Sequence, residues 1–248
     1  HNLMSRMERK SIGIIGASGV IGSAVAKSLD AAGFRLGLHY CTNVNPINQL
    51  LQSSTRASEH FLYQSSLEDL ASGIGVIDAF KAHFGDLHGL ALCAGRVPWK
   101  HETQLEIDDW ANATFELSAQ PFNMALHFSN SCLPESRIVA LSSISATYGG
   151  SSTSRHYGAA KAALESSLIG LARSLACKKI CINVVRAGFV ITPQQTAGRN
   201  DDQIKERIAK IPFQRPGRPE EVAGLVSFLF SDASSYITGQ CISISGGD

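Results

Sequence analysis

Short runs of apolar, largely β-branched residues alternate with longer segments of helical period along the whole chain. A run that is apolar throughout suits a strand covered on both faces, as in a parallel sheet. The alternation therefore predicts an α/β fold with a doubly wound parallel sheet and helices on both faces. We expect strands at Ser11–Ile15, Phe34–Tyr40, Glu59–Tyr63, His88–Cys93, Arg137–Ser142, Ile180–Arg186 and Gln240–Ser245, and helices at Val20–Ala32, Leu67–Phe84, Thr103–Asn130, Arg155–Cys177 and Glu220–Phe230.

The chain has no composition shift that would divide it. Of its 248 residues 44% are hydrophobic, which is enough for one sizeable core, and no linker or repeat interrupts the alternation. We predict a tail at residues 1–9 and a single domain at residues 10–248. In the tail, His1–Met4 resembles an expression remnant, and Met4 or Met7 is the expected native start. The polar segment Thr192–Pro219 is the candidate for a mobile lid.

Charge and cysteine content exclude several classes of protein. Lys and Arg number 22 against 21 acidic residues and lie scattered, so we expect no nucleic-acid partner. No apolar run is long enough for a membrane span and no secretory signal is present, which predicts a cytoplasmic protein. The six cysteines lack a Cys-x-x-Cys pair and the histidines lack ligand spacing, so we expect free, mostly buried thiols and no metal.

The first expected strand runs directly into a glycine-rich turn, Gly16-Ala17-Ser18-Gly19-Val20-Ile21-Gly22, and then into a helix. Glycines at this point let the backbone turn tightly and approach a pyrophosphate at the helix N-terminus. The turn predicts a dinucleotide site with contacts at Gly16, Ser18, Gly19, Ile21 and Gly22. The alternative is a tight turn without a ligand.

The end of the second strand bears on the choice of dinucleotide. Tyr40 is followed by Cys41, Thr42 and Asn43, so the acidic residue that would bind a free ribose 2′-hydroxyl is missing. Thr42 and Asn43 can donate hydrogen bonds to a 2′-phosphate, which favours NADP over NAD. No Arg or Lys stands there to neutralise the phosphate.

Ser143, Tyr157 and Lys161 form the strongest constellation. Ser143 ends an expected strand, and Tyr157 and Lys161 lie one helical turn apart on one face. A tyrosine transfers a proton near neutral pH only if its phenolate is stabilised, and a neighbouring lysine supplies the charge. The alternative is an amphipathic helix that carries Tyr and Lys by chance.

With these motifs in place, the chain from Ser11 to Asp248 resembles a compact short-chain dehydrogenase/reductase, similar to 3-oxoacyl-[acyl-carrier-protein] reductases and polyketide ketoreductases. The resemblance implies a Rossmann-type fold in which Ser143 polarises a carbonyl, Tyr157 is the general acid or base, and Lys161 lowers the tyrosine pKa and holds the nicotinamide ribose. It rests also on Asn183–Gly188, Arg218–Ala223, Ser231–Gln240 and Gly246-Gly247.

The resemblance extends the cofactor site and exposes departures from the family pattern. It implies further cofactor contacts at Gln64, Ser65, Cys93, Ala94, Gly95, Ala187, Gly188, Val190 and Thr192. The family usually has Asn-Asn-Ala-Gly where this chain has Leu92-Cys93-Ala94-Gly95. Gln64 stands in place of the family's Asp, and Ala187 in place of its proline. The family's relay Asn falls at Leu117 if Trp110 and Phe122 guide the alignment, or at Ser118 if Phe115 does; Ser118 could order a water, whereas Leu117 could not.

The resemblance leads to two functional hypotheses. The first is an NADP(H)-dependent enzyme that reduces a ketone, such as a 3-oxoacyl thioester, in a pocket walled by Trp99, Tyr148, Phe189 and Phe213. An acyl carrier protein would dock on Arg137, Arg173, Lys178 and Lys179. The second is a cofactor-binding sensor or assembly protein with little turnover. A sugar-nucleotide epimerase ranks third, because those enzymes need a longer C-terminal substrate region than 248 residues allow. A homotetramer or homodimer is implied in either case.

Overall fold

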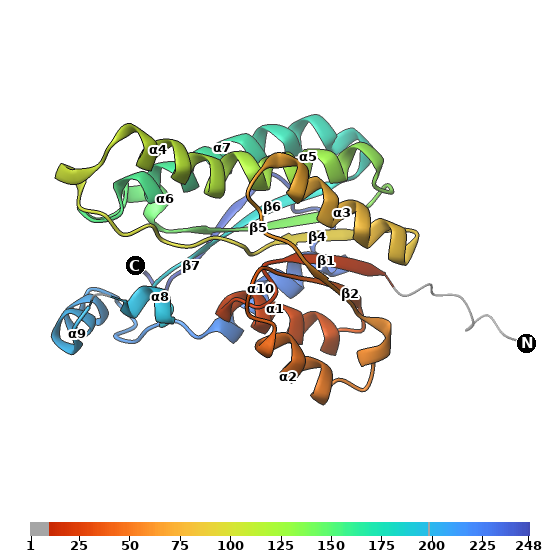
Figure 1. Ribbon diagram of the computed structural model, residues 1–248, viewed down its shortest axis with the longest axis horizontal. Coiled ribbons are helices and arrows are strands. Elements are labelled where there is room, and N and C mark those ends of the chain that lie inside the picture. Colours follow the sequence, from red (N-terminus) through yellow and green to blue (C-terminus); the bar gives the residue numbers. More distant parts are fainter. Residues whose placement is uncertain (1–9, 198) are drawn as a thin grey trace, which may run out of the picture.

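One sheet of seven parallel strands forms the centre of the computed structural model, which describes residues 10–197 and 199–248 (Figure 1). The strands lie in the order β3-β2-β1-β4-β5-β6-β7, so the chain reverses its winding direction beside β1. This confirms the predicted doubly wound α/β fold. The strands are β1 (Ser11–Ile15), β2 (Arg35–Tyr40), β3 (Phe61–Gln64), β4 (Gly89–Leu92), β5 (Arg137–Ser143), β6 (Cys181–Ala187) and β7 (Cys241–Ile244). The predicted tail at residues 1–9 lies outside the described residues.

Helices cover both faces of the sheet (Figure 1). One face carries α1 (Val20–Ala31), α2 (Asn45–Ser53) and α10 (Pro219–Phe230). The other carries α3 (Leu70–Phe84), α4 (Ile107–Thr114), α5 (Gln120–Ser131) and α7 (Arg155–Leu175), with the short α6 (Ser145–Tyr148) packed beside α7. Two further helices, α8 (Pro193–Thr196) and α9 (Asp201–Ala209), follow β6.

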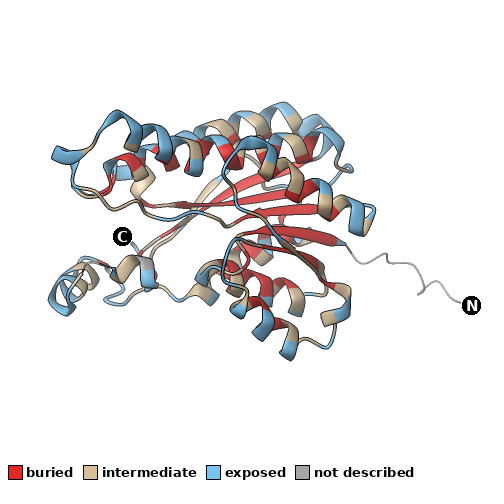
Figure 2. Ribbon diagram, in the orientation of Figure 1, coloured by how far each residue is buried: buried red, intermediate tan, exposed pale blue. Residues whose placement is uncertain are grey.

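The inner strands of the sheet are mostly buried between two layers of helices, as Figure 2 shows, whereas the edge strands β3 and β7 are only partly buried. The core under α1 and α10 includes Leu29, Leu38 and Val226, and the opposite core includes Phe80 and Phe128. Burial on both faces explains why the strands read as continuous apolar runs and why their predicted positions differ from the observed ones by only a few residues.

The observed helices differ from the predicted ones more than the strands do. The expected helix Thr103–Asn130 consists of α4, a π-helical turn at Phe115–Ala119, and α5. The polar stretch after β2 contains α2, which the sequence analysis missed because the helix has few apolar residues and buries only Ile47 and Leu50. The expected lid includes α9, which begins with a capping box between Asn200 and Gln203.

Cysteine placement corrects one expectation. All six cysteines are free, but Cys41 and Cys177 are exposed rather than buried. Within residues 10–197 and 199–248, no helix has the length and apolar character needed to cross a membrane.

A close contact between β1, β2 and α3 sets the geometry of the N-terminal half. Gly13 and Gly37 are paired in register, and the ring of Phe80 lies over both. A methyl group at Gly13 would lie 2.6 Å from this ring, and one at Gly37 2.7 Å. The two glycines therefore make room for a fully buried aromatic side chain.

His39 joins the turn after β1 to the end of β3. The Gly16 N–H donates to Nδ1 of His39 (3.1 Å), and Nε2 lies 2.9 Å from the Ser65 carbonyl oxygen. Nε2 therefore carries the proton, and the ring is neutral. Burial lowers the pKa of His39 below its ordinary value of 6.5, which favours this neutral form.

We expect the Phe80 contact to be sensitive to volume in both directions. Phe80→Ala should lower the free energy of unfolding by about 3–5 kcal/mol, and Gly37→Ala by about 1–3 kcal/mol, in urea denaturation. The matched control is Gly75→Ala in α3, where a methyl group meets nothing within 4 Å. This change should stabilise the protein by up to about 1 kcal/mol. Equal effects at Gly37 and Gly75 would contradict the packing argument.

The His39 contact should make stability depend on pH. Because the folded state holds the His39 proton less tightly than the unfolded state, the free energy of unfolding should fall as pH drops below 6.5. The loss is up to about 1.4 kcal/mol per pH unit. Urea denaturation of the wild type and of His39→Gln at several pH values isolates this group, because the other histidines titrate in both. If the free energy of unfolding depended on pH in the same way in both proteins, the assignment of this effect to His39 would be refuted.

Candidate functional site

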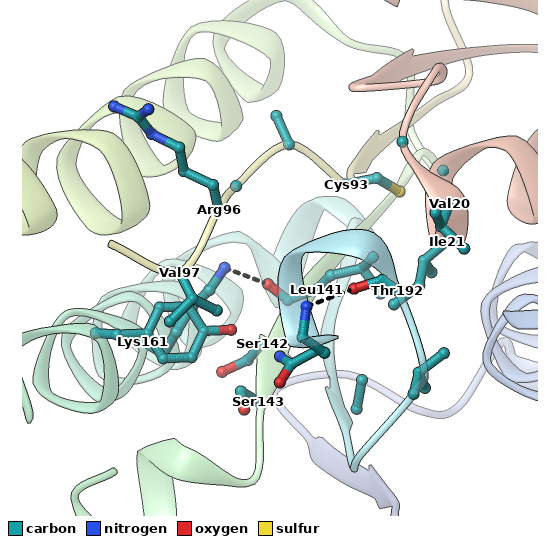
Figure 3. Close-up of a pocket in the computed structure, with 18 of the residues that line it drawn as sticks. Val20, Ile21, Cys93, Arg96, Val97, Leu141, Ser142, Ser143, Lys161 and Thr192 are labelled. Atoms are coloured by element: carbon teal, nitrogen blue, oxygen red, sulfur yellow. Dashed lines mark hydrogen bonds between the residues drawn. The ribbon is translucent and has the colours of Figure 1, made fainter. Parts of the chain in front are cut away.

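A pocket of about 320 Å³, here called the inner pocket, opens where β1, β4, β5 and β6 end, between the starts of α1 and α7 (Figure 3). Carboxyl ends of parallel strands on either side of the winding reversal form the usual ligand crevice of such sheets. The predicted site residues that line it are Ser18, Gly19, Ile21, Gly22, Cys93, Ala94, Gly95, Ser143, Tyr157, Lys161, Ala187, Gly188, Val190 and Thr192.

The three glycines of the first turn have different roles. Gly16 has a φ of +81°, and a Cβ there would lie 2.7 Å from the backbone of Ala94. A Cβ at Gly22 would lie 2.1 Å from the Gly16 oxygen. These two glycines let the chain pack against itself, whereas a Cβ at Gly19 would meet only that oxygen, at 3.4 Å, and would project into open space.

The start of α1 fits a phosphate group. Gly19, Val20, Ile21 and Gly22 line the inner pocket, and no side chain caps the helix. The first N–H groups of a helix have no partner within it and favour an anion. The open wall at Gly19 and these uncapped donors therefore suit the pyrophosphate of a dinucleotide.

Ser143 and Tyr157 meet at the bottom of the inner pocket, from the end of β5 and the first turn of α7. Burial raises the pKa of Tyr157 to about 12, although a hydrogen bond from Ser143 acts in the opposite direction. The phenol is therefore protonated at neutral pH. The expectation that Lys161 lowers the tyrosine pKa stays a prediction.

Lys161 is a buried cation. Its Nζ donates a hydrogen bond of 2.9 Å to the carbonyl oxygen of Leu141, drawn in Figure 3. Burial lowers the pKa of Lys161 to about 8, which the negative charge of Glu165 opposes. The Cys93 thiol is also close, but burial raises its pKa to about 12, so it is neutral near pH 7.

Glu165 lies at the centre of a polar cluster that the sequence analysis did not identify. Its carboxylate accepts a 2.7 Å hydrogen bond from Ser142 and bonds of 2.9 Å and 2.6 Å from Nε and Nη2 of Arg186. The cluster links α7 to β5 and β6. The available signal was a glutamate four residues after Lys161, on the same face of the helix.

The two candidate relay residues, Leu117 and Ser118, lie in different surroundings. Leu117 is buried among Ala113, Ala160 and Tyr157. Its Cδ2 lies 3.1 Å from the place of a Cβ at Gly95, and Lys161 Nζ lies 3.5 Å from the same point. Leu117 therefore lies near Lys161, and the alignment on Trp110 and Phe122 that puts the relay position at Leu117 stays a prediction.

Ser118 is buried but does not line the inner pocket. The expectation that its hydroxyl orders a water there finds no support in the geometry.

The residues predicted for the adenosine end lie together but outside the inner pocket. Tyr40 and Gln64 are paired in register at the ends of β2 and β3, and the Ser65 N–H donates to the Tyr40 carbonyl oxygen at 3.1 Å. Thr42 and Asn43 are exposed at the neighbouring surface. Asn43 accepts a hydrogen bond from the Asn45 backbone, which orders this turn.

A smaller cavity of about 100 Å³, here called the outer pocket, shares Ser143 and Tyr157 with the inner one. Trp99, Tyr148 and Phe189 line it, as predicted, whereas Phe213 is exposed and lines a neighbouring groove. The outer pocket also contains two residues absent from the prediction, Arg199 and Arg207, which the segment after β6 contributes.

The basic residues predicted at the entrance lie elsewhere. Arg137 is buried at the amino end of β5, at the opposite edge of the sheet, and donates to Ser234. Arg173 lies in the last turn of α7, some 16 residues or about 24 Å from Tyr157 in the first. Lys178 and Lys179 follow that end of the helix. These residues form no patch beside either pocket.

Comparison with known proteins agrees with this arrangement. A family model described as "Enoyl-(Acyl carrier protein) reductase" matches residues 13–248. The 3-oxoacyl-[acyl-carrier-protein] reductase FabG of Salmonella typhimurium is 29% identical over 94% of this chain and 95% of its own. The uncharacterized oxidoreductase YmfI of Bacillus subtilis is 32% identical over 94% of this chain and 96% of its own.

Solved structures share the fold. A short-chain dehydrogenase/reductase from Serratia marcescens superposes with a TM-score of 0.88 at 24% identity, covering 96% of this chain and 97% of its own. A blue fluorescent protein from a metagenomic library, solved with NADPH, gives the same TM-score and coverage at 25% identity. The chain belongs to the short-chain dehydrogenase/reductase family of oxidoreductases.

Proposed function

We propose that the protein is an NADP(H)-dependent reductase of ketones. The observation that carries this proposal is the meeting of Ser143, Tyr157 and Lys161 in one pocket with the uncapped start of α1. The glycine turn would hold the pyrophosphate, Thr192 and Gly188 the nicotinamide end, and Thr42 and Asn43 the adenosine end. A bound nicotinamide supplies the hydride.

In this proposal the side chains handle the oxygen of the substrate. The Ser143 hydroxyl donates a hydrogen bond to the carbonyl oxygen, and Tyr157 delivers a proton to it. A phenol with a pKa near 12 holds its proton at neutral pH, which suits an acid that serves reduction. Once the proton has left, the Lys161 ammonium stabilises the tyrosinate, because both side chains line the same pocket.

The relatives support the substrate class and the cofactor. The Salmonella protein is named for 3-oxoacyl-[acyl-carrier-protein] reduction, and the metagenomic protein was solved with NADPH. A 3-oxoacyl thioester or similar ketone, an acyl carrier protein as its carrier and a homo-oligomer therefore belong to the proposal. Six free cysteines suit the reducing cytoplasm, where we place the enzyme.

One observation favours a second candidate, a cofactor-binding protein with little turnover. The apolar Leu117 lies beside Lys161 at the relay position, where it can neither donate nor accept a proton. Measured turnover separates the two candidates.

Removing the tyrosine hydroxyl should abolish reduction but leave cofactor binding. Tyr157→Phe should lower kcat for NADPH oxidation with a panel of ketones by about 10²–10⁴-fold, because it removes the proton donor. Cofactor titration followed by NADPH fluorescence should give a Kd close to that of the wild type. Tight NADPH binding by the wild type without turnover on any ketone would favour the second candidate.

The ionisation of Lys161 should limit reduction at high pH. We expect kcat to be level below pH 8 and to fall as pH rises through about 8, where Lys161 loses its charge. Glu165→Gln removes the anion that raises the pKa of Lys161, so this limb should move to lower pH. The exposed Glu206→Gln is the control and should not move it. Identical profiles for all three proteins would contradict the assignment.

A further inference from the structure

The outer pocket carries positive charge next to the proposed proton donor. Its charged lining residues are both arginines, Arg199 and Arg207, and they share the pocket with Ser143 and Tyr157. The other lining residues are apolar or neutral polar. A molecule bound here with its carbonyl group at Tyr157 therefore has a guanidinium group within the same small cavity.

Arg199 is held firmly. The carbon of its guanidinium lies 4.9 Å from the ring centroid of Trp99 and 5.6 Å from that of Phe189, within cation–π range. Nη1 donates to the backbone oxygen of Gln195 at 2.9 Å and to its side-chain oxygen at 3.3 Å. These contacts orient the guanidinium without neutralising it.

The two arginines differ in their partners. Arg207 forms an ion pair with Asp248. Among residues 10–197 and 199–248, Arg199 forms no ion pair. It donates hydrogen bonds through Nη1 only, and both acceptors are neutral oxygens. Burial and the charge of Arg207 both lower the pKa of Arg199, which shows that the surroundings disfavour its charge.

The edge formed by Nε and Nη2 thus remains available on a partly buried cation. A guanidinium presents two parallel N–H groups along this edge, and they match the two oxygens of a carboxylate. A partly buried charge without a counter-ion is unfavourable, so an anionic ligand gains from entering. A cavity of about 100 Å³ is well below the range of drug-sized sites, which favours a short molecule.

We propose that Arg199 binds the carboxylate of the substrate, so that the ketone reduced at Tyr157 belongs to a short, free oxo acid rather than to a carrier-bound thioester. The inference rests on the proposed function for the identity of the reacting group. The carboxylate site itself can be tested without turnover, because Trp99 lies against Arg199 and reports on it.

The first experiment measures binding. Trp110→Phe leaves Trp99 as the sole tryptophan of the chain. In this background, acetoacetate should change the Trp99 emission in a saturable manner in the presence of NADP⁺, whereas methyl acetoacetate and inorganic phosphate should bind far more weakly. Arg199→Gln should weaken acetoacetate binding by about 10- to 100-fold, the loss of a charge-assisted pair. Arg199→Lys keeps the positive charge but not the two parallel donors, so its affinity for acetoacetate should lie between those of the unsubstituted Arg199 protein and Arg199→Gln.

The second experiment measures selectivity. The ratio of kcat/KM for acetoacetate to that for its methyl ester should fall about 10- to 100-fold in Arg199→Gln. The exposed Arg173→Gln, at the far end of α7, is the matched control and should leave the ratio unchanged. An equal loss for acid and ester would mean that Arg199 only holds the segment after β6 in place, and would overturn the proposal.

The remaining outcomes separate the two proposals. Binding of acetoacetate that depends on Arg199, without reduction of any ketone, would support the carboxylate site and refute the proposed function. Reduction of neutral ketones with no preference for acetoacetate would support the function and refute the site. Phosphate that binds as tightly as acetoacetate would refute the choice of a carboxylate.

Discussion

The site depends on a buried ion pair cluster around Glu165. A lysine ammonium in a protein interior is unfavourable unless polar groups surround it, and Lys161 has the Leu141 carbonyl and the charge of Glu165. The charge of Glu165 is in turn balanced by Arg186, whose Nε and Nη2 donate hydrogen bonds to the carboxylate. Because the cluster spans α7, β5 and β6, it fixes the helix that carries Tyr157 and Lys161 against the strand that ends in Ser143. The relative positions of these three side chains follow from that contact.

Charge is distributed unequally between the two pockets. In the inner pocket the ammonium of Lys161 faces a nearby carboxylate, and the uncapped start of α1 provides partial positive charge for phosphate. In the outer pocket Arg207 has Asp248, but Arg199 has only aromatic rings and neutral oxygens around it. The inner pocket therefore suits the phosphates of the proposed cofactor, and the outer pocket suits an anionic group on the proposed substrate.

Several features of the fold were predictable because they arise from local sequence. The inner strands are covered on both faces, which makes them mostly apolar, and the glycines of the first turn follow β1 directly. The helix α2 was missed because it spans only nine residues and buries just two side chains, Ile47 and Leu50. The π turn at Phe115–Ala119 shifts the helical phase, so periodicity could not decide whether Leu117 or Ser118 faces the site.

The sequence by itself determined the alternation of strands and helices, the glycine turn and the spacing of Tyr157 and Lys161, because each depends on residues close together in the chain. Tertiary structure alone decided which charges meet. Glu165 and Arg186 are 21 positions apart, and Arg199 reaches Trp99 from a different segment, so no local pattern reveals either contact. It also shifts the pKa values of Tyr157 and Lys161 from their ordinary values, because burial disfavours the charged form of each side chain.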